Sequence, residues 1–107
     1  MTPQEIINQE YCVQADKIRK KMVLQSYYKY GEAKTNYSQK LVNTMGCLER
    51  CLDKYRRTGN TEYLLDGMNY LMFEFMYPQL NGAYYKPTDS DGSAGIDGMS
   101  CKQIMEG

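Results

Sequence analysis

Residues 60–78 of the chain read NTEYLLDGMNYLMFEFMYP, which is its most apolar run. Apolar side chains point in nearly every direction around a helix of this sequence: Leu64, Leu65, Met68, Leu71, Met72, Phe75 and Met76. Pro78 cannot continue a helix, so we predict a helix over residues 60–77. Because a helix that is apolar nearly all round is typically buried, we expect this one to form the core.

Three polar residues interrupt the apolar run at the spacing of one helical line. Glu62, Asp66 and Asn69 are separated by four and then three positions. A polar group inside a core must find a partner or lose free energy, so this line is the best functional signal of the helix. Glu62 lies near the expected start, where it can serve the helix N-terminus. Asp66 and Asn69 remain as candidate ligand-binding residues.

The N-terminal part of the chain predicts a long helix over residues 2–30. Thr2 and Glu5 match a capping box, and Pro3 suits the first helical turn. Apolar residues at helical spacing continue along the segment, and Gly31 is a natural end. Part of this wide apolar surface is expected to contact a second copy of the chain, so we predict a homo-oligomer.

A second helix is predicted over residues 36–58. Its apolar residues repeat every four and three positions, as in a coiled-coil seam: Leu41, Met45, Leu48, Leu52 and Tyr55. A short turn at residues 58–60 separates it from the apolar helix, so the two should form an antiparallel hairpin. The predicted fold is all-α, with a helical hairpin core, a long N-terminal helix and a loop-rich tail over residues 78–107, in a single domain over residues 1–107.

Composition argues against several kinds of partner. Thirteen basic and thirteen acidic residues balance, which argues against nucleic acid. No apolar run approaches the ~20 residues needed to cross a membrane. Four cysteines without a secretion signal predict reduced thiols in a cytoplasmic protein. The absence of histidine and of a CxxC pair argues against zinc, and we expect no cofactor.

Lysines and tyrosines form two candidate contact patches. In the first helix, a patch of Lys20, Lys21, Tyr27 and Tyr28 could bind an anion while a ring stacks on a base, or it could be a solvated helix face. Tyr84 and Tyr85 form a second patch, for which packing of the tail onto the bundle is the alternative. Residues 89–98 begin like a calcium loop but lack its later glycine and glutamate, so a flexible acidic loop or lid is expected.

Two acidic pairs flank the predicted hairpin turn. Glu49 and Asp53 are four residues apart in the second helix, and Glu62 and Asp66 are four apart in the third. Four carboxylates on two adjacent helices could bind Mg²⁺, which takes oxygen ligands. The alternative is that these acids pair with the arginines and lysine beside them.

The acidic pairs carry a resemblance to a known family. The segment EYLLDGMNY, residues 62–70, is similar to the second acidic helix of phage-borne MazG-like nucleoside triphosphate pyrophosphohydrolases. That resemblance implies a Mg²⁺-dependent hydrolase that uses Glu49, Asp53, Glu62 and Asp66. Each acidic pair of this chain is one residue wider than the corresponding pair of the family.

A second resemblance is to short accessory proteins of bacteriophages and prophages. The segments RTGNTEYL (residues 57–64) and FEFMYP (residues 73–78) have this character. The resemblance implies a protein that blocks a host enzyme or sequesters a nucleotide signal, including in counter-defence. With no evident nucleophile–base pair, we expect a non-catalytic protein that binds a host protein or a nucleotide-like ligand, with the pyrophosphohydrolase as the alternative.

Overall fold

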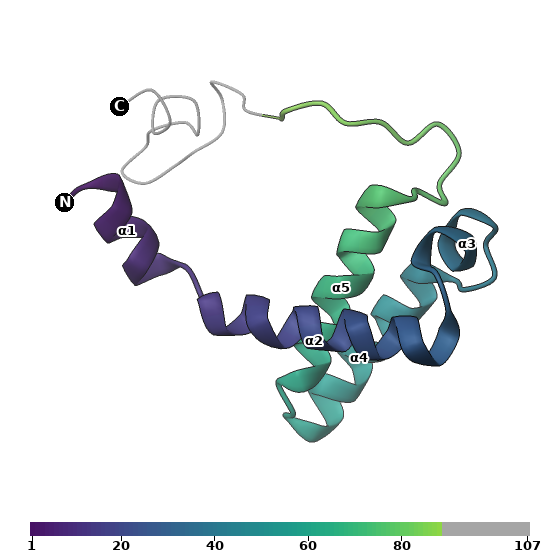
Figure 1. Ribbon diagram of the computed structural model, residues 1–107, viewed down its shortest axis with the longest axis horizontal. Coiled ribbons are helices and arrows are strands. Elements are labelled where there is room, and N and C mark those ends of the chain that lie inside the picture. Colours follow the sequence, from purple (N-terminus) through teal and green to yellow (C-terminus); the bar gives the residue numbers. More distant parts are fainter. Residues whose placement is uncertain (89–107) are drawn as a thin grey trace.

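A computed structural model describes residues 1–88, in which every regular element is a helix (Figure 1). The helices are α1 (Pro3–Glu10), α2 (Val13–Tyr30), α3 (Ala33–Ser38), α4 (Thr44–Thr58) and α5 (Glu62–Met76). The all-α prediction is confirmed. The candidate calcium loop, Cys101 and the rest of residues 89–107 lie outside the described part of the chain.

The hairpin of α4 and α5 is the centre of the fold, as expected from the short turn between them (Figure 1). Gly59 ends α4 in the left-handed conformation at φ 74°, which a residue with a side chain rarely adopts. Gly67 brings the two helices together, because a Cβ atom at this position would lie 3.2 Å from Leu48 Cδ1. Leu48, Cys51 and Phe73 are buried in or beside this contact.

The long N-terminal helix predicted over residues 2–30 is two helices, α1 and α2. Tyr11 and Cys12 adopt extended backbone conformations between them. Side chains stabilise the break: Cys12 Sγ caps the amide of Ala15 at 3.4 Å, and the Tyr11 hydroxyl donates to Asp16 Oδ2 at 2.8 Å. Only α2 crosses the α4–α5 pair, and α1 extends away from it (Figure 1).

The helix predicted over residues 36–58 is also divided, into α3 and α4. Asn43 caps the start of α4 by accepting from the amide of Gly46 at 3.1 Å. Gln79, which follows α5, holds the intervening loop: its Nε2 donates to the carbonyls of Tyr37 and Val42, and its Oε1 accepts from the amide of Thr44. A local cap and a residue far away in the sequence therefore both hold the chain where the two helices are divided.

The helix predicted over residues 60–77 corresponds to α5, but the expectation that it is buried all round is wrong. Only Gly67, Asn69 and Phe73 are buried. α4 covers one side, and α2 and α3 pack elsewhere on α5, while one side is left open by the helices of residues 1–88 and exposes Met68, Leu71 and Phe75 by 39%, 51% and 71%. The three helices that contact α5 therefore do not enclose its apolar side chains on every side. Within residues 1–88 there is no helix with the length and apolarity to span a bilayer.

Candidate functional site

Asn69 is the most deeply buried amide side chain of the described chain, and its partner is Arg19. Asn69 is 6% exposed and lies where α5 passes under α2. Its Oδ1 accepts from Arg19 Nε at 3.0 Å, and its Nδ2 donates to the carbonyl of Arg19 at 3.2 Å. One buried amide thus holds both the backbone and the guanidinium of a residue fifty positions earlier in the sequence.

A pocket of about 480 Å³ opens at this contact, between α2 and α5. Its wall is lined by Asp16, Arg19, Lys20, Val23, Leu24, Asn69 and Met72. We call this pocket the α2–α5 groove. It combines apolar surface with two cationic groups and one carboxylate, so its lining can contact both parts of an amphipathic anionic ligand.

Asp66 lies one turn before Asn69 and borders a small, partly open cavity of about 30 Å³. Burial, and then the neighbouring charge of Glu62, raises the pKa of the Asp66 carboxyl above its usual value. The volume suffices for a water molecule next to the carboxylate. Asp66 and Asn69 therefore border one cavity, as their common helical line predicts, but Asp66 does not line the α2–α5 groove.

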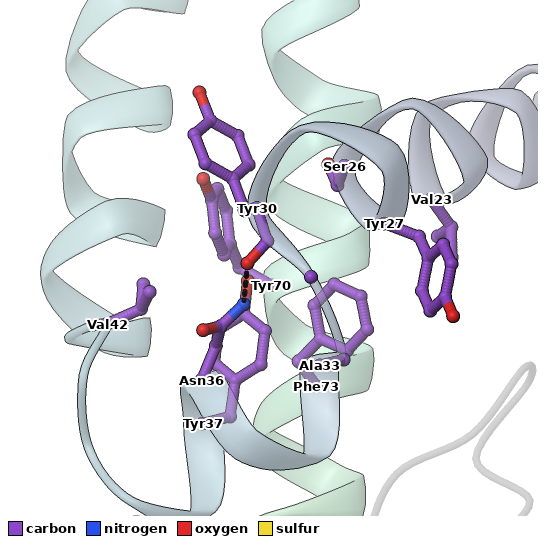
Figure 2. A pocket seen from close by; sticks show the side chains of 11 residues that line it. Val23, Ser26, Tyr27, Tyr30, Ala33, Asn36, Tyr37, Val42, Tyr70 and Phe73 are labelled. Carbon is purple, nitrogen blue, oxygen red and sulfur yellow. Dashed lines mark hydrogen bonds between the residues drawn. The ribbon is translucent and has the colours of Figure 1, made fainter.

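A second pocket, of about 260 Å³, lies between the end of α2, α3 and α5 (Figure 2). Tyr27, Tyr30, Tyr37 and Tyr70 line it, with Phe73 stacked on Tyr37 at 4.6 Å between ring centroids. Burial raises the pKa of Tyr37 to about 12 and also raises the pKa of Tyr70. Among residues 1–88 no charged side chain lines this pocket, which we call the tyrosine pocket, so these residues give it none of the cations that a phosphate group would need.

The predicted patch on the first helix lies on the outer side of α2. Lys20, Lys21, Tyr27 and Tyr28 are all exposed, Tyr28 by 82%. Lys17 and Leu24 lie among them at helical spacing, and both are exposed. We call the six residues the cationic face. The only acid of α2, Asp16, is turned towards Arg19 and Tyr11 instead.

The predicted second patch lies elsewhere. Tyr84 and Tyr85 are strongly exposed beyond the end of α5, where the Tyr85 ring meets Phe75 edge-to-face at 6.3 Å between ring centroids. Neither residue lines the α2–α5 groove or the tyrosine pocket. The structure therefore places them apart from the other six candidate ligand-binding residues.

The four carboxylates of the alternative metal site do not come together. Residues 1–88 contain no group of three or more acidic, cysteine or histidine side chains that could hold a metal ion. Glu49 and Asp53 each follow a residue of the apolar seam, Leu48 or Leu52, and so lie about 100° further round α4. Glu49 is exposed, and Asp53 pairs with Arg57 at 3.0 Å.

Arg19 is the main site residue that the sequence did not single out. It lies in a basic run whose other members are lysines, and it shares a helical line with Ala15, Met22 and Ser26. An arginine in phase with small and apolar residues is a signal for an inward-facing guanidinium. Its partner Asn69 had no detectable link to it in the sequence.

Comparison of the chain with protein-family models, with curated proteins and with solved structures gives no match.

Proposed function

We propose that this protein is a non-catalytic binding protein, and that it recognises an acidic surface of another protein through the cationic face of α2. The observation that carries the proposal is the composition of this face. Three lysines and three large apolar or aromatic side chains lie together on a helix with no buried residue. None of the three lysines forms an ion pair within residues 1–88.

This composition suits a protein partner better than a nucleotide. Tyrosine and leucine supply large contact areas at protein interfaces, and clustered lysines attract an acidic surface and speed association. A nucleotide site would need cations gathered around a cradle for phosphate, whereas no charged side chain in the described part of the chain lines the tyrosine pocket. The bacteriophage resemblance supports a host protein as the target, and a counter-defence role would follow from blocking it.

The test begins with identification of the partner and ends with a direct binding measurement. Proteins that the immobilised chain retains from a host extract are identified by mass spectrometry, purified, and titrated by calorimetry. Simultaneous charge reversal at Lys17, Lys20 and Lys21 is expected to weaken binding at least about tenfold, and high salt should weaken the unmodified complex.

A matched control reverses three exposed basic residues outside the cationic face: Lys34, Lys40 and Arg56. This variant has the same net charge as the first, so its affinity should stay near that of the unmodified chain. Equal losses for the two variants would show a general charge effect and contradict the proposal.

The rival hydrolase is tested on the same protein. Release of pyrophosphate from mixed nucleoside triphosphates with Mg²⁺, abolished by Asp66→Ala, would overturn the non-catalytic proposal.

We also propose that a second copy of the chain covers the open side of α5. Leu64, Met68, Leu71 and Phe75 follow each other by four, three and four residues, which is the spacing of a coiled-coil seam. This stripe contains no charged side chain, so two copies can meet without burying a charge. It lies on another side of α5 from the contact with α2, so both proposed interfaces can be occupied together.

A further inference from the structure

The α2–α5 groove opens next to the cationic face and shares Lys20 and Leu24 with it. Val23, Leu24 and Met72 supply its apolar surface. A volume of about 480 Å³ lies in the range of pockets that enclose a compact organic group, and it exceeds what a single water molecule requires. The groove can therefore accept a bulky apolar side chain from a partner that is docked on the cationic face.

The guanidinium of Arg19 lies in this groove with unused hydrogen-bonding capacity. Asn69 occupies only its Nε. Its Nη2 meets the thioether of Met72 at 3.7 Å, a weak acceptor. Its Nη1 is 3.7 Å from Asp16 Oδ1, beyond normal hydrogen-bond length, and the other oxygen of Asp16 accepts from Tyr11. Neither terminal nitrogen has a hydrogen bond to an oxygen within residues 1–88.

Arg19 is also held in place before any ligand arrives. The buried amide of Asn69 binds both its backbone and its side chain, and the Arg19 side chain is only 20% exposed. A guanidinium fixed in this way loses little conformational entropy when it binds, and its planar fork matches a carboxylate. Arg19 and Lys20 together outweigh the single negative charge of Asp16, so the groove is net cationic.

We infer that the α2–α5 groove binds a peptide segment of the acidic partner. A bulky apolar side chain of the segment packs on Val23, Leu24 and Met72, and a carboxylate next to it binds Arg19. Asn69 is the positioning residue. This inference rests on the proposed function, because the cationic face supplies the first contact with the acidic partner, and it specifies which segment the partner must present.

The test uses defined peptides as probes. The parent is a capped peptide with one phenylalanine flanked on both sides by glutamates; one counterpart replaces the phenylalanine by alanine, and another replaces the glutamates by glutamines. Binding to the full chain is followed by NMR through the backbone amide signals of Val23 and Met72. Each counterpart is expected to bind at least about tenfold more weakly than the parent.

The variant Arg19→Gln tests whether the guanidinium of Arg19 binds the carboxylate of the peptide. It should weaken binding of the parent peptide about tenfold or more, but barely change binding of the glutamine peptide, which has no carboxylate to lose. Arg19→Lys should restore part of the affinity, and Asn69→Ala should resemble Arg19→Gln. A purely structural role of Arg19 would weaken both peptides equally. The peptide substitutions leave the protein unchanged, so they decide the matter even if a variant unfolds.

The remaining outcomes separate this inference from the proposed function. If charge reversal at Lys17 and Lys21 weakens the acidic peptides while the phenylalanine and Arg19 changes have no effect, the groove inference is overturned and the cationic face stands. If no acidic peptide binds and the charge reversal leaves the captured partner bound, both are overturned. If decanoate shifts the groove signals and the peptides do not, the groove takes a free fatty acid, which also overturns the inference.

Discussion

Asp66 is a half-buried carboxylate that opposes folding when it is ionised. Burial and the charge of Glu62 raise its pKa above 3.8 in the folded chain, so the folded state holds the proton more tightly than the unfolded state. The resulting penalty is absent below about pH 4, the ordinary carboxyl pKa, and is complete once the pH passes the raised folded value.

The variant Asp66→Asn removes this charge. We predict a higher melting temperature than that of the unmodified chain at neutral pH, and a difference that shrinks as the pH falls towards 3, because both side chains are then neutral. Thermal unfolding followed by circular dichroism between pH 3 and pH 8 checks this. A difference that grows on acidification would contradict the assigned direction of the pKa shift.

Gly67 controls how closely α4 and α5 approach. A Cβ atom there would lie 3.2 Å from Leu48 Cδ1 and 3.9 Å from Cys51 Cβ, so Leu48 must give way by a few tenths of an ångström to admit even one methyl group. We predict that Gly67→Val lowers the free energy of unfolding by about 1–3 kcal/mol through overpacking. Urea denaturation measures the change. The control, Glu49→Ala at an exposed helical position, should stay within about 0.5 kcal/mol.

At the scale of elements, the loop between α3 and α4 is held by one side chain. Gln79 forms three hydrogen bonds to that loop and to the first amide of α4. The Gln79→Ala variant leaves the partly buried carbonyl of Val42 without a donor and the amide of Thr44 without an acceptor, so we predict a loss of about 1–3 kcal/mol in unfolding free energy.

Hydrogen exchange localises this effect. Amide protection should fall in the first turn of α4 more than in the middle of α5, because the lost bonds hold only the loop and the helix start. Gln25→Ala is the matched control, since Gln25 is exposed on α2 and has no side-chain hydrogen bond within the described residues. Uniform loss of protection along the chain would show that Gln79 serves the whole fold instead of this loop.

At the scale of the molecule, the open side of α5 predicts self-association. Light scattering after size exclusion should give a mass above 12.4 kDa at high protein concentration, and the melting temperature should rise with concentration. The double variant Met68→Glu and Leu71→Glu should be monomeric, because association would bury its charges. Leu41→Glu, at an exposed position away from the stripe, should associate like the unmodified chain. A monomeric unmodified chain would contradict the proposed interface.

The two interfaces differ in how they should respond to salt. Contacts of the cationic face weaken as salt screens its lysines, whereas the uncharged α5 stripe should be nearly indifferent to salt. Measuring partner binding and self-association at low and high salt therefore tells which surface each complex uses. The same dependence for both would show that one surface serves both interactions.

Local patterns in the sequence predicted much of the helical fold. Pro78 correctly predicted where α5 ends, Thr2 the start of α1, and Gly59 the end of α4. The short turn after α4 correctly predicted the antiparallel hairpin. These features depend on neighbouring residues, which the sequence displays directly. The line of Asp66 and Asn69 was likewise visible, because helical spacing alone places them together.

Other features depend on residues that are distant in the sequence, and only the tertiary structure decided them. Gln79 forms hydrogen bonds to the loop between α3 and α4, which lies more than thirty positions earlier in the sequence. Asn69 likewise binds Arg19, which lies fifty positions earlier. The same limit applies to α5, because its apolar residues could not reveal that the other helices of residues 1–88 leave one of its sides open. The sequence by itself determined most of the helical segments and their outer ends, because backbone hydrogen bonds and caps are local, but it did not reveal the two breaks at residues 11–12 and 39–43. Which polar and apolar groups face each other was decided by packing, which joins residues with no neighbour relation in the sequence.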